Sequence, residues 1–511
     1  MYDAIIVGGG HNGLVASNYL AKAGLKVLIL ERRDLVGGAC VTEELFPGHR
    51  ISSCSYICYL LQEKVIDDLQ LRKHGFEVYR LDPTRFHPFP DGKYTLGWHD
   101  EERNLEEIRR LSPHDAKAYP DWVAFWERAA GILHPYFLTS PPTVMELASR
   151  VRGTPDEEVL ETMLTMSMRD LIDEFFESEH LRASFIQAHD VGDPNAPGSI
   201  FCNAYYRCSL FSADDTVGIP KGGMGGITQA MARSAQAEGV EIQTGVEVEK
   251  ILIENGKALG VVLKSGEEIR SKITISNADP KRTFLKLVDP EHLDSEFIKQ
   301  IVRLRTNTAY LKFHAALKEL PDFSAYLGEG FDPKCLASIR ICPSVDYFEQ
   351  SWIDAKGGRP SRYPVMAVQI PSVYDPTLAP PGHHVMSIWV LYAPVQLRER
   401  KWDDVRQQVG EHLIDTLAIY APNIKEAMID WVLFTPADLE RRVGLTDGNI
   451  RHLDIIPSQF LAHRPLSQWT QYKTPISALY LCGGGTHPGG EVTGAPGHNA
   501  AHAILREWEA K

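Results

Sequence analysis

The chain has 511 residues, enough for about two to four domains or for one large interleaved enzyme fold. Apolar residues make up 44% and charged residues 23% of the chain, which is typical of a globular protein with a large core. The net charge of −14 argues against non-specific binding of nucleic acid, and no long basic run occurs. No apolar run approaches the roughly 18 residues of a membrane span.

The first residues predict a buried strand, Tyr2 to Val7, so we expect no cleaved leader. The eight cysteines include no Cys-x-x-Cys pair, which favours a reducing, cytoplasmic compartment. Cys54 and Cys58 are expected one helical turn apart as buried, unpaired thiols. The histidines show no spacing typical of a metal site, and we expect no metal.

Residues 2–31 predict a strand, a glycine-rich turn, a helix that Gly24 stops, and a second strand. Gly8, Gly10 and Gly13 form a Gly-x-Gly-x-x-Gly turn, around His11 and Asn12. Such a turn lets the backbone and the helix N-terminus approach a pyrophosphate. Glu31 ends the second strand, where a carboxylate can accept both hydroxyls of a ribose. This pattern predicts a bound dinucleotide.

A glycine doublet, Gly37-Gly38, follows Glu31 and lets a second backbone segment lie against the dinucleotide. The predicted cofactor contacts here are Arg32, Arg33, Gly37, Gly38, Ala39 and Thr42, with Arg33 placed to neutralise the phosphates. Because a flavin reaches further than a nicotinamide, the doublet favours FAD.

Strand-like runs at 240–244, 246–253, 258–263 and 269–276 predict an antiparallel meander, with Asn255-Gly256 and Ser265-Gly266 as hairpin turns. Val248 lies in this meander and is a predicted cofactor contact. A meander after a helix is typical of FAD domains. The glycines at 222–226 lack the dinucleotide spacing, so no second nucleotide domain is expected.

The chain ends in a strand, a loop with many glycines and a helix. Unprotected amides of this loop can face the flavin, and the helix N-terminus favours the negative charge of the reduced ring. The predicted contacts in this stretch are Gly483, Gly485, Glu491, Val492, Thr493 and Asn499.

We therefore expect an α/β fold in which a Rossmann-like FAD-binding domain carries an inserted α+β substrate domain. The FAD-binding domain is predicted at 1–75, 217–289 and 441–511. The substrate domain is predicted at 76–216 and 290–440. An amphipathic helix is expected from Asp403 to Tyr420. The aromatic side chains between Tyr119 and Phe137 predict core packing, or alternatively a lipophilic tunnel or a helix that dips into a membrane.

With these residues in view, the chain resembles the phytoene desaturase-like flavoenzymes, a branch of the amine oxidase superfamily. The resemblance rests on residues 8–14, 31–38, 444–450, 482–490 and 493–499, with His452 and Arg464-Pro465. Within that branch, these motifs are similar to the carotene ketolases and to the pyridine nucleotide-disulfide oxidoreductase domain-containing protein 2 group. The resemblance implies non-covalent FAD and a p-hydroxybenzoate hydroxylase-like two-domain fold. Ala39 stands where desaturases commonly have arginine, which argues against strict desaturase activity.

The expected function is oxidation of a lipophilic, carotenoid- or isoprenoid-like substrate by hydride transfer to flavin N5, in a dehydrogenase, ketolase or isomerase. His452, Arg464 and Lys312 are the candidate catalytic residues; Lys312 is alternatively a surface or salt-bridged lysine. An oxidase of an amine or other small molecule, or a flavoprotein with mainly a regulatory role, are the alternatives. The electron acceptor, O2 or a quinone, stays open, as do a homo-oligomer and peripheral contact with a membrane.

Overall fold

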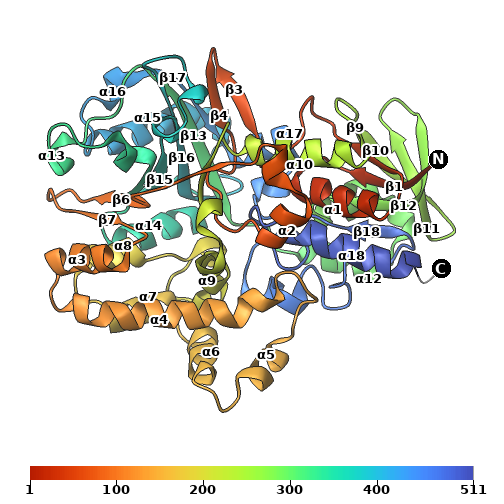
Figure 1. The fold of residues 1–511 in the computed structure, drawn as a ribbon, viewed down its shortest axis with the longest axis horizontal. Helices are drawn as coiled ribbons and strands as arrows, with labels where there is room; N and C mark the ends of the chain where they lie inside the picture. The colour runs from red at the N-terminus through yellow and green to blue at the C-terminus, as the bar shows by residue number, and fades with distance from the viewer. Residues whose placement is uncertain (510–511) are drawn as a thin grey trace.

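A parallel sheet forms the frame of the first half of the molecule in the computed structural model, which describes residues 1–509 (Figure 1). Its strands run in the order β18–β12–β1–β2–β9. Their bounds are β1 Tyr2–Val7, β2 Val27–Leu30, β9 Glu241–Gln243, β12 Glu268–Ser276 and β18 Leu479–Leu481. The start, the middle and the end of the chain therefore meet in one sheet.

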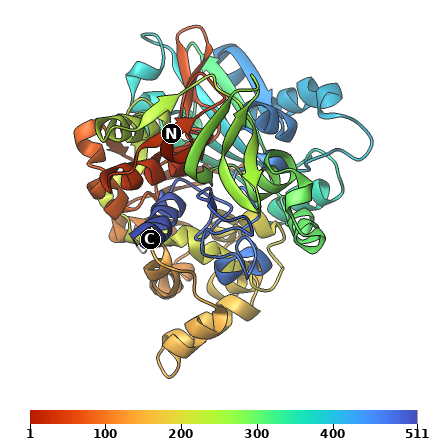
Figure 2. The ribbon, with the colours of Figure 1, turned by 90° about the vertical axis from the view of Figure 1, so that its right-hand side faces the viewer.

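The two faces of this sheet are covered differently. Alternate residues of β1 point to opposite faces, so that Ala4 and Ile6 pack under the helices while Ile5 and Val7 pack under the meander. The helices are α1 His11–Lys22, α10 Gly225–Ala237 and α18 Ala495–Glu509, and the meander strands are β10 Val248–Glu254 and β11 Lys257–Leu263, which continue into β12. Figure 2 shows the meander in green beside the N-terminus.

One strand of the predicted meander lies elsewhere. The run at 240–244 forms β9, which pairs parallel with β2 at the edge of the sheet, with Leu28 opposite Glu241. The meander therefore has three strands, β10 to β12, and its turn at Asn255-Gly256 has positive φ at both residues, as predicted for this dipeptide.

A second, mostly antiparallel sheet forms the frame of the other half, in the order β17–β13–β16–β15–β14–β6–β7. The bounds are β6 Arg85–Pro88, β7 Tyr94–Gly97, β13 Ala309–Leu317, β14 Ser338–Ile341, β15 Val365–Gln369, β16 His384–Ala393 and β17 Met428–Phe434. One face packs on α15, Trp402–Ala418, through Phe313 and Ile388. The other face carries Tyr310, Lys312 and Trp389 towards the first domain. The helix predicted at 403–420 is thus confirmed within two residues.

Helices between residues 101 and 207 form a layer beside the second sheet, at the bottom of Figure 1. They are α3 Glu101–Leu111, α4 Asp115–Leu133, α5 Val144–Val151, α6 Asp156–Thr165, α7 Met168–Phe175, α8 Glu179–Phe185 and α9 Ser199–Arg207. Trp122 and Trp126 of α4 are buried in the core of this layer, so core packing is what the aromatic stretch provides. Among residues 1–509, no helix combines the length and the apolar character needed to cross a bilayer.

The remaining elements are short. Two small antiparallel pairs are β3 Thr42–Phe46 with β4 His49–Ser52, and β5 Val78–Arg80 with β8 Gly218–Pro220. The other helices are α2 Glu63–Asp68, α11 Pro280–Arg282, α12 Ser295–Arg303, α13 Ser324–Leu327, α14 Val345–Lys356, α16 Ile424–Ala427 and α17 Pro436–Val443. Cys54 and Cys58 lie in an extended segment after β4, which corrects the helical spacing expected for them; both thiols are buried and free.

Candidate functional site

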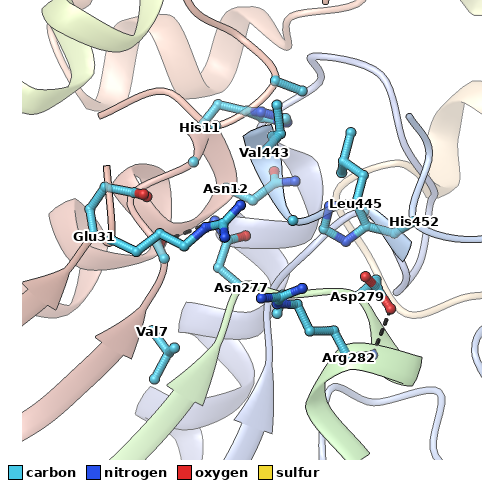
Figure 3. Close-up of a pocket in the computed structure, with 18 of the residues that line it drawn as sticks. Val7, His11, Asn12, Glu31, Asn277, Asp279, Arg282, Val443, Leu445 and His452 are labelled. Carbon is cyan, nitrogen blue, oxygen red and sulfur yellow. Dashed lines mark hydrogen bonds between the residues drawn. The ribbon is translucent and has the colours of Figure 1, made fainter. Parts of the chain in front are cut away.

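A groove opens where the carboxyl ends of β1, β2 and β12 meet the chain's last 70 residues (Figure 3). It encloses about 970 Å³ of space, part of it open to solvent, which is ample for a dinucleotide. Its wall includes Gly8, Gly10, His11, Asn12, Glu31, Arg32, Gly38, Ala39, Val248, Asn277, Arg282, His452, Gly490 and Glu491. Most of these residues are the ones that the sequence predicts as cofactor contacts.

The glycine turn is shaped by close approaches that only glycine permits. A Cβ on Gly13 would lie 2.5 Å from the backbone oxygen of Gly8, so α1 could not start so near β1. A Cβ on Gly10 would lie 2.8 Å from Nδ2 of Asn277, which itself donates to the Gly8 carbonyl. The turn thus leaves the first amides of α1 at the floor of the groove.

Glu31 lies at the end of β2 with its carboxylate over the turn, as Figure 3 shows. One carboxylate oxygen accepts from the Gly9 amide at 2.8 Å and the other from the Arg33 amide at 2.9 Å. Each oxygen keeps a lone pair for a further donor. The carboxylate is therefore held in place with the capacity to accept the two hydroxyls of a ribose.

Three buried side chains of the groove carry polar atoms that have no partner within residues 1–509: His11 Nε2, Asn12 Oδ1 and His452 Nδ1. Burial lowers the pKa of His11 to about 4, with a smaller effect of His452, and burial with nearby Arg464 lowers the pKa of His452 to about 4. Both rings are therefore neutral at physiological pH. Buried polar atoms left without partners fit a cofactor that supplies them, and the donor set fits FAD.

Two arginines exchange the roles expected for them. Arg33 is turned away from the groove, because its guanidinium pairs with Glu43 at 2.6 Å and donates to the Gly38 carbonyl at 3.2 Å. Arg32 lines the groove together with Arg282 from the start of the segment after β12. Positive charge for a pyrophosphate is thus available from Arg32 and Arg282.

The other predicted contacts divide into those that face the groove and those that support it. Gly37 donates to the Gly9 carbonyl at 2.8 Å, and Thr42 accepts from the Gly225 amide at 2.9 Å, so both fasten neighbouring segments together. Gly483 and Gly485 pack on His452 and Pro280 behind the groove. The Thr493 hydroxyl accepts from the amide of Ala495 at the start of α18. The structure does not bring Asn499 to the groove: its amide donates to the Phe137 carbonyl.

A smaller chamber continues from the groove, with His11, Ala39, Ile450 and Glu491 in the wall of both. Its further wall is formed by Cys40, Cys54, Ser55, Tyr56, Ile57, Tyr59, His189, Trp389, Arg451 and Val492. Trp389 comes from the second sheet and His189 from the helical layer, so the chamber lies where the two halves of the molecule meet. Its wall is mainly apolar and aromatic, with one guanidinium and one carboxylate.

Lys312 lies on the same face of the second sheet but outside the chamber wall. Its ammonium donates to the Ser387 hydroxyl at 2.9 Å and lies 5.1 Å from the Tyr56 ring, and the side chain is only 1% exposed. Burial lowers its pKa to about 7. Lys312 is thus neither the surface lysine nor the salt-bridged lysine of the sequence-based alternative, and it reaches the chamber only through Tyr56.

The depressed pKa of Lys312 predicts a pH-dependent stability. Between pH 7 and the ordinary lysine value of 10.5 the unfolded chain binds a proton that the folded chain releases, so stability increases as the pH is raised and is lowest below pH 7. Relative to Lys312→Met, the free energy of unfolding of the wild type should rise by about 1 kcal/mol per pH unit across this window. Denaturant titrations at several pH values measure it. Lys318→Met, at an exposed position just after the same strand, is the control, and parallel curves for wild type and Lys312→Met would contradict the prediction.

Arg464 is fully buried, but the structure does not bring it to the chamber. Its guanidinium is engaged by backbone carbonyls behind the C-terminal glycine loop, those of Arg451, Leu453, Asp454, Gln459 and Gly484. Every nitrogen of the group has an acceptor there, so none is left for a substrate. This corrects the expectation that Arg464 lines the cavity.

Sequence reasoning missed Asn277, Arg282 and Arg451. Asn277 directly follows β12, and the carboxyl end of a strand next to β1 is where a dinucleotide contact belongs. That signal needed the strand order, which the sequence pattern does not give. Arg451 stands between two residues of the recognised 444–452 segment, but nothing in its neighbours marks it as facing a second cavity.

Comparison with known proteins agrees with this geometry. The model of the flavin containing amine oxidoreductases matches residues 13–417. The chain is 36% identical to pyridine nucleotide-disulfide oxidoreductase domain-containing protein 2 of Rattus norvegicus, over 99% of this chain and 94% of that protein. It is 29% identical to one of the subunits of limonene dehydrogenase from Castellaniella defragrans, over 99% and 94%. A crystal structure of an oxidoreductase from Methanosarcina mazei shares the fold, with a TM-score of 0.62 at 18% identity over 98% and 99% of the two chains.

Proposed function

The chain belongs to the family of flavin-containing amine oxidoreductases, and from this premise we propose that it oxidises a lipophilic, isoprenoid-like small molecule rather than an amine. It is an FAD-dependent oxidoreductase with a Rossmann-like FAD domain and an α+β substrate domain. FAD, when bound, accepts a hydride from a substrate C–H bond, so that the substrate is oxidised by two electrons. Those electrons then pass to a second acceptor, O2 or a quinone.

The observation that carries the proposal is the wall of the chamber beside the cofactor groove. Its side chains are mainly aromatic and apolar, and its one cation is Arg451. A protonated amine would enter next to this guanidinium and be repelled by it. The carboxylate of Glu491 does not compensate, because it already pairs with Arg451 at 2.9 Å. Limonene, an isoprenoid, is named as the substrate of one relative, which agrees with this proposal.

An amine substrate is the second candidate, because Tyr56 and Trp389 both line the chamber with ring centroids 5.9 Å apart. Two neighbouring aromatic faces can hold an ammonium by cation–π attraction. In this chamber, however, the guanidinium of Arg451 already lies 5.8 Å from the centre of the Trp389 ring. The aromatic side chains are thus partly used by a cation that the protein supplies.

Anaerobic reduction of the flavin distinguishes the two candidates. The protein, loaded with FAD, is mixed with a cyclic monoterpene, with a linear carotenoid in detergent and with a set of primary amines, while the absorbance of the oxidised flavin is followed. We expect bleaching with an isoprenoid and none with the amines. Admitting air or a soluble quinone afterwards identifies the electron acceptor by which of them restores the colour. Bleaching by amines alone would overturn the proposal.

A further inference from the structure

Arg451 is buried in the chamber wall and joins three parts of the molecule. Its Nη1 donates to Asp190 at 2.7 Å and to the Tyr310 hydroxyl at 2.8 Å, while its Nε donates to Glu491 at 2.9 Å. The side chains of Arg451 and Asp190 are 3% and 1% exposed. A buried arginine held by two carboxylates is fixed in position, in contrast to a surface arginine.

One nitrogen of this guanidinium is left over. An arginine carries five N–H groups, and the contacts of Nε and Nη1 account for three of them. The two N–H groups of Nη2 have no acceptor in the described chain, residues 1–509. Because Arg451 lines the chamber, Nη2 is the donor that it offers to a molecule bound there.

The charge around Arg451 restricts what that acceptor can be. Asp190 and Glu491 together offset the positive charge of the guanidinium, so a carboxylate or phosphate of a substrate would join two carboxylates already present. An ammonium has no lone pair to offer. A neutral oxygen, that of a hydroxyl or a carbonyl group, accepts the hydrogen bond without adding charge.

A pure hydrocarbon fits this wall less well. It would cover Nη2 without supplying an acceptor, and an N–H group that loses water without a new partner costs about 1–3 kcal/mol, or more when it is charged. The indole nitrogen of Trp389, in the same wall, is also buried without an acceptor in residues 1–509. Two donors in one small chamber therefore call for a ligand oxygen.

We propose that the substrate carries a neutral oxygen function, a hydroxyl or a carbonyl, which accepts a hydrogen bond from Nη2 of Arg451. The inference rests on the proposed function and narrows its substrate class from isoprenoids in general to oxygenated ones. Arg451 is then a specificity-determining residue. Fixed by Asp190 and Glu491, it would hold the oxygen-bearing end of the substrate next to the junction of chamber and groove.

A matched ligand series tests this. Three molecules with one carbon skeleton, a cyclic monoterpene hydrocarbon, its alcohol and its ketone, are titrated into FAD-loaded protein, and Kd is measured from the shift of the flavin absorption spectrum. We expect the alcohol or the ketone to bind at least about tenfold more tightly than the hydrocarbon, the value of one good hydrogen bond. Equal Kd values for all three would overturn the inference while leaving the proposed function intact. If none of them binds or reduces the flavin, both fail.

The variant Arg451→Lys locates the donor. Lysine keeps the positive charge for Asp190 and Glu491 but cannot reproduce Nη2, so the preference for the oxygenated ligands should fall to about twofold or less while the Kd of the hydrocarbon is unchanged. Arg207→Lys, in α9 and outside the chamber wall, is the matched control. If Arg451→Lys instead changes the affinity for FAD and leaves the ligand preference intact, Nη2 serves the cofactor and the inference is overturned. The comparison of ligands on the wild type stands even if the variant does not fold.

Discussion

Replacing Gly13 by alanine is expected to give a folded protein that purifies without flavin. The added Cβ would lie 2.5 Å from the Gly8 backbone oxygen, and neither atom can move unless α1 shifts against β1. Such a shift takes the amides at the start of α1 away from the pyrophosphate. We expect the affinity for FAD to fall at least about 100-fold, or about 2.7 kcal/mol. Titration of the flavin-free protein with FAD measures this loss, and far-UV circular dichroism verifies the fold.

Two further variants make the prediction specific. In Gly10→Ala the new methyl group meets the side-chain nitrogen of Asn277 at 2.8 Å, and that side chain can rotate, so the loss should be smaller than in Gly13→Ala. In Gly131→Ala, inside α4, the methyl group makes an ordinary 3.7 Å contact with Phe211, so FAD affinity should not change. A Gly13→Ala protein as yellow as the wild type would show that the pyrophosphate lies elsewhere.

The glycine turn was predictable from sequence because its geometry is local. A strand, three glycines and a helix lie within a few residues, and the acid that completes them ends the next strand. Asn277 contacts the same turn but lies 269 residues from Gly8 in the chain. Only the order of strands, with β12 beside β1, brings it there. Periodicity identifies strands but does not give their order, so this half of the site could not be predicted.

Charged side chains were the least predictable part of the site, for a related reason. The sequence gives the position of an arginine but not its partner. Arg33 is two residues from Glu31, yet Glu43 holds it away from the groove, whereas Arg282 reaches the groove from a distant segment. Lys312 was expected by resemblance near the flavin, and whether a lysine in a strand is buried depends on what covers that sheet face. The direction of a long side chain is decided by its tertiary neighbours.

The second large effect is expected at Arg464, on stability rather than on binding of a substrate. Arg464→Met should lower the free energy of unfolding by about 4–5 kcal/mol, among the largest effects of a single substitution. Methionine fills a similar volume but donates no hydrogen bond. Five buried carbonyls, including those of Gly484 and Arg451, would then lose a charged donor in a place that water does not reach. Denaturant unfolding of the FAD-free protein measures the effect without a contribution from the cofactor.

Arg464→Lys separates this role from the catalytic one. Burial lowers the pKa of Arg464 to about 10, so the guanidinium stays charged at neutral pH, and lysine would keep that charge but not the planar fork that reaches the carbonyls of Arg451 and Gly484 together. Stability should therefore fall to an intermediate value. The rate of flavin reduction per bound FAD should change little, because no nitrogen of Arg464 faces the chamber. Unchanged stability together with a large loss of that rate would instead place Arg464 among the reacting groups. Since the carbonyls that Arg464 holds belong to the segments carrying Arg451 and Gly484, the same bonds that stabilise the fold also fix the wall of the groove and the donor of the chamber.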